Sequence, residues 1–240
     1  KGIYGPLMID SDENVIVATE NGYIYAIEGS SGKKKWSFSI GSKTLSAPAV
    51  GKSGTIYVGG ENGYIYAIEG SSGKKKWFLN IGKGIYGPLM IDSDENVIVA
   101  TKDITKNGYG YIYAIEGSNG KKKWSFGSRS ALWSNPVDDT AGNIYIGSWD
   151  GYIYAIEGSS GKKKWSFHVG VLTDSSPVIG NNGIVYAVSS EGNVFAFERN
   201  EGLPEWSFSV GHKVRWSAIV ENEGVVYIVT GSGHIYAIKA

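Results

Sequence analysis

One fifteen-residue stretch, GYIYAIEGSSGKKKW, occurs three times without change, at Gly22–Trp36, Gly63–Trp77 and Gly151–Trp165. A fourth copy, at Gly110–Trp124, differs only in carrying Asn119 in place of a serine. The Tyr/Phe–Ala pair inside this stretch recurs six times, at successive steps of 41, 47, 41, 41 and 41 residues. A fixed period of this length indicates a repeat protein in which each copy is one supersecondary unit.

Each repeat reads as four short strands separated by polar turns. In the first repeat the expected strands are Ile3–Ile9, Val15–Thr19, Tyr23–Glu28 and Lys33–Ser39. The last repeat carries only three, because its pattern runs no further than GHIYAIKA at Gly233–Ala240. Four strands about every 40 residues, with no helical periodicity, are typical of propeller blades. The sequence therefore predicts an all-β propeller of six blades, the last of them incomplete.

We expect the 240 residues to form a single propeller domain. The predicted repeats are 1–41, 42–82, 83–128, 129–169, 170–210 and 211–240.

The charge balance, the lack of Cys and the short apolar runs exclude several classes of partner and site. The 23 Lys and Arg residues balance 23 Asp and Glu residues, so the chain lacks the basic field that favours nucleic acid. The absence of Cys excludes disulfides and thiolate metal sites. No apolar run approaches the roughly 18 residues that a membrane-spanning helix needs. We therefore expect no nucleic-acid partner and no insertion into a membrane.

A spaced triplet marks each of the first five repeats, and in the first it consists of Ala26, Gly32 and Trp36. The tryptophans of the other four triplets are Trp77, Trp124, Trp165 and Trp206. The triplet resembles the tryptophan-docking motif of PQQ-like repeat propellers, the quinoprotein alcohol dehydrogenase-like superfamily. The resemblance implies that each Trp packs on the neighbouring blade. A large aromatic ring, a small Ala beside it and a Gly in the turn suit such packing.

Two charged patterns are interpreted as structural. The KKK triplets fall on the expected outermost strand, where lysine protects a free sheet edge from pairing. The turn DSDEN, at Asp10–Asn14 and Asp92–Asn96, alternates oxygen-bearing side chains as a calcium loop does. However, Val15 stands where an EF-hand loop needs Gly, and Asn21 stands where it needs Glu. We therefore expect ordinary turns and predict no metal ligands. The three histidines show no metal-ligand spacing either, although His168 and His212 could approach each other between neighbouring blades.

Residues that depart from the repeat are the functional candidates. They fall in the connections from fourth to first strands and in the turns between second and third strands. Both connections lie on one side of an up-and-down blade, so we expect them to converge at the mouth of the central channel. The candidate binding-face residues are Arg129, Trp133, Trp149, Asp150, His168, Asp174, Lys213, Arg215 and Trp216. The insertion at Lys102–Tyr109 belongs to the same face. Aromatic planes beside cations favour an anionic or peptidic ligand, whereas the opposite face is expected to carry little but short turns.

We interpret the chain as a non-catalytic binding or scaffold propeller, with no predicted catalytic or cofactor-binding residue. The resemblance implies modules such as the propeller lipoprotein of outer-membrane protein assembly, and it favours an extracytoplasmic location. The expected partner is a protein, a peptide or a small anionic ligand.

Two alternatives stay open. One is a quinoprotein dehydrogenase that holds PQQ with Ca²⁺; the resemblance implies a carboxylate and amide cage, an Asp base, a stacking Trp and often a vicinal Cys pair. This chain has no Cys, and Asp174 is the single acid in its first-strand entry loops. The other alternative is a recently amplified or engineered propeller without a ligand.

Overall fold

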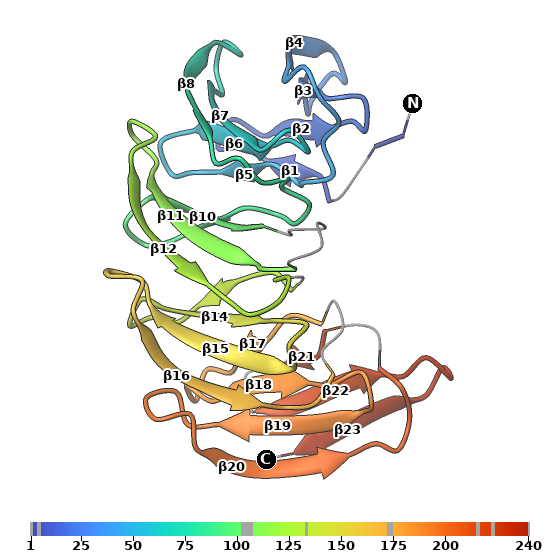
Figure 1. Cartoon of the computed structure of the whole chain (residues 1–240). Coiled ribbons are helices and arrows are strands. Elements are labelled where there is room, and N and C mark those ends of the chain that lie inside the picture. Colours follow the sequence, from blue (N-terminus) through green and yellow to red (C-terminus); the bar gives the residue numbers. More distant parts are fainter. Residues whose placement is uncertain are drawn as a thin grey trace. The chain divides into compact units, whose positions relative to one another are not determined.

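The computed structural model describes residues 2–3, 6–101, 108–132, 134–171, 175–214, 217–221 and 224–239. Within these ranges the chain forms 23 β-strands and no helix. The strands make six separate antiparallel sheets, each built from strands that follow one another in the chain (Figure 1). Five sheets have four strands and the sixth has three. The predicted all-β propeller class, six blades with an incomplete last blade, is confirmed.

The first three sheets have the same strand order. The first contains β1 (Met8–Ile9), β2 (Asn14–Ala18), β3 (Tyr23–Glu28) and β4 (Lys34–Ser39). The second contains β5 (Ala49–Val50), β6 (Thr55–Gly59), β7 (Tyr64–Glu69) and β8 (Lys75–Asn80). The third contains β9 (Met90–Ile91), β10 (Asn96–Thr101), β11 (Tyr111–Glu116) and β12 (Lys122–Gly127).

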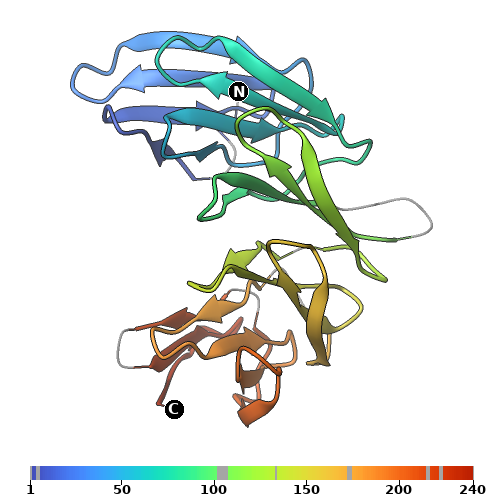
Figure 2. The same cartoon turned by 90° about the vertical axis from the view of Figure 1, so that its left-hand side faces the viewer.

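The last three sheets continue this order until the final strand. The fourth contains β13 (Val137–Asp138), β14 (Asn143–Gly147), β15 (Tyr152–Glu157) and β16 (Lys163–His168). The fifth contains β17 (Val178–Ile179), β18 (Val185–Val188), β19 (Asn193–Phe197) and β20 (Pro204–Ser209). The sixth contains β21 (Ile219–Val220), β22 (Val225–Val229) and β23 (Ile235–Lys239). Both views show the strands of each sheet side by side in chain order (Figures 1 and 2).

The chain divides into two compact units. Unit 1 comprises Lys1–Asp103 with Ile112–Ser125, and unit 2 comprises Ile104–Tyr111 with Phe126–Ala240. Unit 1 therefore holds the first two sheets and most of the third. Unit 2 holds the last three sheets and the adjoining ends of β11 and β12. The single domain over 1–240 stays a prediction.

The first strand of each sheet is much shorter than the sequence indicates. The first repeat was expected to begin with a strand at Ile3–Ile9, but β1 covers only Met8–Ile9. Ile3 makes an isolated bridge to Thr19 instead. Pro6 has no N–H and cannot donate to a strand ladder, which accounts for the interruption. The predicted length was therefore wrong.

The third and fourth strands of a sheet pair in a register that places Ala opposite Trp. In the first sheet Ala26 pairs with Trp36 and Ile24 pairs with Phe38. The register then shifts between Ala26 and Ile27, as in a β-bulge. The same pairing and shift occur in the second, fourth and fifth sheets. A bulge bends the outer strand and re-aims its side chains, so a repeated bulge gives each Trp the same direction.

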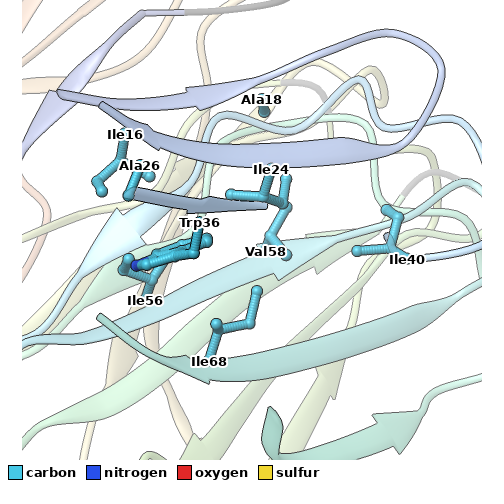
Figure 3. Close-up of a cluster of buried hydrophobic side chains, with 9 residues drawn as sticks. All are labelled: Ile16, Ala18, Ile24, Ala26, Trp36, Ile40, Ile56, Val58 and Ile68. Carbon is cyan, nitrogen blue, oxygen red and sulfur yellow. The ribbon is translucent and has the colours of Figure 1, made fainter. Parts of the chain in front are cut away.

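The core of unit 1 lies between neighbouring sheets. Trp36 is buried among Ile16, Ile24 and Ala26 of its own sheet and Ile56, Val58 and Ile68 of the next (Figure 3). Its indole Nε1 donates a hydrogen bond of 2.7 Å to the Gly70 carbonyl. Its ring lies against Gly73, where a Cβ atom would come within 2.7 Å of the ring. One side chain thus joins two sheets by apolar burial and by a hydrogen bond.

The same docking geometry recurs along the chain. Trp77 Nε1 donates to the Gly117 carbonyl at 2.7 Å, and Trp165 Nε1 donates to the Arg199 carbonyl at 2.8 Å. Their rings lie against Gly120 and Gly202. Each acceptor stands four residues after the Tyr or Phe of the repeated Tyr/Phe–Ala pair. The same position of each repeat therefore supplies the carbonyl that accepts the indole N–H.

The tryptophans are not equally enclosed. Trp36, Trp124 and Trp165 are 7–8 % exposed, whereas Trp77 and Trp206 are half-buried. The Trp206 Nε1 atom is buried and has no acceptor among the described residues. Gly32 meets no atom within 4 Å, so no ring of the described chain lies on it. The docking hydrogen bond is therefore made by Trp36, Trp77 and Trp165, whereas Trp206 makes none to the described residues.

We predict that Trp36→Ala lowers the free energy of unfolding by about 3–5 kcal/mol, the usual cost of truncating a large core aromatic. Trp206→Ala should cost less than half as much, because its ring is half-buried and its indole N–H makes no hydrogen bond to the described residues. Urea unfolding of both variants measures the difference. Equal losses would contradict the docking contribution assigned to Trp36.

Candidate functional site

The structure describes five of the nine predicted binding-face residues. They are Arg129, Trp149, Asp150, His168 and Lys213. Trp133, Asp174, Arg215, Trp216 and positions 102–107 of the insertion lie outside the described residues. Trp149 and Asp150 lie in the turn before β15, His168 ends β16, and Arg129 lies in the connection from β12 to β13. Lys213 lies elsewhere, in the connection that leads to the sixth sheet, where its carbonyl accepts the Gly231 N–H. His212 stacks on His234 with the ring centres 5.1 Å apart.

The turn before β15 holds Asp150 in a defined position. Its Oδ1 accepts the Tyr152 N–H at 3.1 Å, and its Oδ2 accepts the Tyr154 hydroxyl at 2.6 Å. In the second sheet Asn62 makes the first of these bonds to Tyr64, so Asp150 keeps a turn function and adds a negative charge. His168 packs edge-on against Tyr152, with ring centres 5.1 Å apart. The predicted acid and imidazole therefore flank one pair of tyrosines.

A pocket of about 310 Å³ opens beside these tyrosines within unit 2. Its lining residues are Phe126, Gly127, Arg129, Tyr152, Tyr154, Lys163 and Ser166. Phe126 forms one wall and packs on Tyr154 at 5.4 Å between ring centres. Arg129 and Lys163 give the pocket two cations. The Lys163 Nζ atom also lies 3.4 Å from the Ser166 hydroxyl, to which it donates.

Two departures from the repeat shape this pocket. Gly127 stands where the corresponding residues are Ser39, Asn80, His168 and Ser209, so a side chain is missing from the wall. Arg129 stands where four other repeats carry a glycine at the fifth position after the docking Trp. Those four glycines all have a positive φ, between 69° and 97°. The third repeat has thus exchanged a turn glycine for a cation beside an opened wall.

The electrostatics of the pocket favour an anion. Burial raises the pKa of Tyr154, and its hydrogen bond to the Asp150 carboxylate raises it further. The phenol therefore stays protonated and neutralises part of the Asp150 charge by donating to it. Arg129 is exposed and Lys163 is exposed, so both can rotate toward a ligand. A carboxylate bound between them would receive charge-assisted hydrogen bonds in a partly aromatic surrounding.

Sequence reasoning found only one residue of the pocket lining. Phe126, Tyr152, Tyr154, Lys163 and Ser166 were missed because each belongs to the repeated pattern. Gly127 was missed because a glycine offers no side chain to notice. One signal in the sequence could have revealed the pocket: within a few residues, the third repeat loses a side chain at position 127 and gains a cation at position 129.

The opposite side of the same unit carries a larger cavity, of about 610 Å³. Asp138, Asp139, Asn181, Glu198, Arg199 and Glu205 are among its lining residues. The expectation that this side offers little but short turns was therefore wrong. The cavity is a widened form of a crevice that unit 1 also has, of about 220 Å³, lined by the corresponding Asp10, Ser53, Glu69 and Lys76. There Lys76 donates to Thr55 at 2.8 Å, whereas Glu205 occupies its place in the larger cavity.

Asp139, one of the acids that line the larger cavity, serves the fold. The Asp139 carboxylate accepts the N–H groups of Ala141 and Asn143, the Asn143 amide and the Tyr145 hydroxyl, at 2.8–2.9 Å. Burial alone would raise the pKa of Asp139, but these hydrogen bonds outweigh it and hold the pKa below its ordinary value. Asp10 closes the matching turn of the first sheet in the same way. A similar crevice occurs in unit 1, and the Asp139 carboxylate is already hydrogen-bonded within its own sheet. This cavity is therefore a weaker candidate for a binding site than the pocket beside Arg129.

We predict a pH-dependent contribution of Asp139 to stability. Because its pKa is lower in the folded chain, its stabilising effect is complete above the unfolded value of about 4 and is lost as the pH falls through the folded value. Asp139→Asn should therefore lower the free energy of unfolding at pH 7. The difference in free energy of unfolding between this variant and the native chain should become smaller as the pH drops below about 4. Urea unfolding between pH 2.5 and 7 measures this. A destabilisation that is the same at every pH would contradict it.

The described residues do not fit a quinone–calcium site. No group of three or more His, Asp or Glu side chains lies close enough within the described ranges to hold a metal ion, and the sequence has no Cys. A calcium site needs six to eight oxygen ligands, of which carboxylates are the main source. Asp174, the acid considered for the quinoprotein alternative, lies outside the described residues.

Comparison with a protein family places the repeat in context. The model of a PQQ-type family, described as "Outer membrane protein assembly factor BamB", matches residues 20–240. A comparison with curated proteins finds no match.

None of the described residues forms a helix with the length and apolar character needed to cross a membrane.

Solved structures share the fold at low sequence identity. BamB from Moraxella catarrhalis is 18 % identical with a TM-score of 0.64, over 98 % of this chain and 87 % of that one. The quinohemoprotein alcohol dehydrogenase from Comamonas testosteroni is 15 % identical with a TM-score of 0.77, over 96 % of this chain. A europium-containing methanol dehydrogenase is 13 % identical with a TM-score of 0.81, over 95 % of this chain. The chain spans only 52 % and 62 % of those two dehydrogenase chains.

Proposed function

Because the chain belongs to the PQQ-like repeat propeller family described as outer membrane protein assembly factor BamB, we propose that it is a non-catalytic binding and scaffold module. The repeated residues build the blades, and the pocket beside Arg129 takes an anionic group of a protein or peptide partner. The family description concerns assembly of proteins, which supports a protein partner over a small metabolite.

The paired exchange at Gly127 and Arg129 carries this proposal. In a chain whose repeats are nearly identical, one connection loses a side chain and gains a cation at the same pocket. Packing does not require Arg129, since four other repeats form the corresponding turn with a glycine. An exposed guanidinium next to Tyr152 and Phe126 matches a carboxylate flanked by aromatic side chains.

The non-catalytic part of the proposal has separate support. The donor set of the described residues does not fit the calcium cage of a quinoprotein, and no vicinal Cys pair exists. The likeness to the dehydrogenases lies below 25 % identity and concerns the fold alone. Fold does not carry function across such distances. Binding of added PQQ and Ca²⁺ with a quinone absorbance and reduction of a dye by alcohol would contradict this part.

The pocket can be tested with the peptide acetyl-Phe-Glu-Phe-amide, titrated against the chain by NMR. Arg129→Ala should weaken binding about tenfold, since a hydrogen bond to a charged group contributes about 1.5–3 kcal/mol. Gly127→Ser, which restores the side chain found in other repeats, should also weaken binding by refilling the wall. Replacing the peptide Glu by Gln should cost about as much as Arg129→Ala.

The matched control is Arg199→Ala, which removes the arginine of the larger cavity in the same unit. Its backbone carbonyl still accepts the Trp165 indole, so docking is preserved. This variant should bind the peptide as the native chain does. Loss of binding in Arg199→Ala with retention in Arg129→Ala would move the site to the larger cavity and overturn the assignment.

A further inference from the structure

The larger cavity of unit 2 is formed by the fourth and fifth sheets. Its lining comes from the β13–β14 turn, the β17–β18 turn and the β19–β20 hairpin with the start of β20. All of these residues belong to unit 2, and both sheets have their four strands. The volume of about 610 Å³ lies within the range of cavities that hold a small ligand, roughly 300–1,000 Å³. The corresponding crevice of unit 1 has only about 220 Å³.

The side chain at position 199 accounts for the width of the cavity. In the second sheet this position is Gly70, whose N–H donates to the Gly54 carbonyl at 3.2 Å, and the fourth sheet repeats this bond. A Cβ atom on Gly70 would lie 2.4 Å from that carbonyl oxygen. Arg199 has a Cβ atom, and in the described structure no hydrogen bond joins its N–H to Gly183. The two turns of the fifth sheet are therefore held apart.

The Arg199 guanidinium lies at the wall of the cavity. Its Nη1 atom lies beside Gly183, where an added Cβ atom would be 3.4 Å away, and Gly183 lines the same cavity. The Arg199 carbonyl serves the fold, because it accepts the Trp165 indole N–H. Its guanidinium forms no hydrogen bond or ion pair with the described residues. The side chain of Arg199 therefore has donors left for a ligand.

A second departure from the repeat reverses a charge at this cavity. In the second sheet Lys76 stands on the bulge of the outer strand, and its Nζ atom donates to the Thr55 hydroxyl at 2.8 Å. A bulge re-aims the side chain that it carries. The fifth sheet has the same bulge with Glu205 in place of the lysine and Ile184 in place of the acceptor. Glu205 lines the cavity and forms no hydrogen bond or ion pair with the described residues.

Two of the other acids that line the cavity serve their own sheets. Asp139 closes the β13–β14 turn, as described above. The Glu198 carboxylate accepts the N–H groups of Asn200 and Glu201 at 2.9 and 2.7 Å. In contrast, Arg199 and Glu205 are bound to nothing in the described structure, and no ion pair joins them to each other. The cavity therefore presents a cation and an anion that the fold does not use.

We propose that this cavity binds a small zwitterion of the size of a dipeptide, with one free carboxylate and one free ammonium group. The ligand carboxylate lies at the Arg199 guanidinium, whose planar fork of donors matches it. The ligand ammonium donates to the Glu205 carboxylate. Asn181 and Asn200 line the same cavity, and their amides suit the peptide group between the two charges.

The lining favours a zwitterion over other small ligands. A ligand with a single sign of charge would leave either Arg199 or Glu205 without a partner. No aromatic side chain lines the cavity, so it lacks the stacking surface that a planar base would use. The site does not include Arg129 or its pocket, so this inference stands apart from the proposed function.

NMR titration with L-alanyl-L-alanine and two capped forms tests the proposal. The C-terminal amide of this dipeptide lacks the carboxylate, and the N-acetyl form lacks the ammonium group. The amide should bind about tenfold more weakly, because a hydrogen bond to a charged group contributes about 1.5–3 kcal/mol. The N-acetyl form should bind about two- to fivefold more weakly, the range for an ion pair with an exposed carboxylate.

Two variants assign each end of the ligand. Arg199→Gln should bind the dipeptide and its amide equally, and Glu205→Gln should bind the dipeptide and its N-acetyl form equally. Arg199→Gln keeps the backbone carbonyl that accepts the Trp165 indole, so docking is preserved. The matched control is Glu201→Gln, which removes an acid of the same hairpin that does not line the cavity. This variant should bind all three ligands as the native chain does.

Amide chemical shifts locate the contact. The dipeptide should move the signals of Gly180 and Gly183, which line the cavity, and leave that of Gly127 in place. The proposal is overturned if the native chain does not bind the dipeptide, or if the shifts gather at Gly127. It is also overturned if either variant still distinguishes the end that it should no longer recognise, or if Glu201→Gln weakens binding as Glu205→Gln does.

Discussion

The fold depends on tryptophans of the outer strands, shown by Trp36, Trp77 and Trp165, which dock against the hairpin turn of the next sheet. A four-stranded sheet alone exposes both of its faces, so repeat architectures gain stability from the interfaces between neighbours. Trp36 fastens such an interface twice, by burial among aliphatic side chains of two sheets and by its bond to Gly70. Gly73 is required at this place because its left-handed backbone and absent side chain let the ring approach.

The repeats are nearly identical because each must form this tryptophan contact. The shared residues therefore leave few positions at which a binding site can differ from one repeat to another. In the fifteen-residue stretch, the Tyr, Ala, Gly and Trp residues already serve strand pairing, the β-bulge and the docking of the indole ring. Discrimination therefore falls to positions where one repeat differs from the others. Gly127 with Arg129, in and after the last strand of the third sheet, is such a place. This exchange creates a pocket lined by two cations, Arg129 and Lys163.

The sequence predicted much of the fold because the period and the Ala–Gly–Trp spacing repeat a physical contact. Strand number, the three-stranded sixth sheet and the pairing of the outer strand could all be read from it. The length of the first strand could not, because Pro6 interrupts a stretch that looks continuously apolar. Pocket residues such as Tyr152 and Lys163 escaped because they look the same in every repeat, and only their surroundings differ. Trp133, Asp174, Arg215 and Trp216 stay predictions.

The central claim is that the Trp36–Gly73 contact couples two sheets, and a double-mutant cycle measures it directly. Gly73→Ala and Gly32→Ala both place a side chain at a similar positive φ, 72° and 67°, but Gly32 faces open space. Urea unfolding should show Gly73→Ala costing about 1–3 kcal/mol more than Gly32→Ala, the range for overpacking a filled site. In a Trp36→Ala background that excess should disappear. An excess that persists without the indole ring would contradict the account.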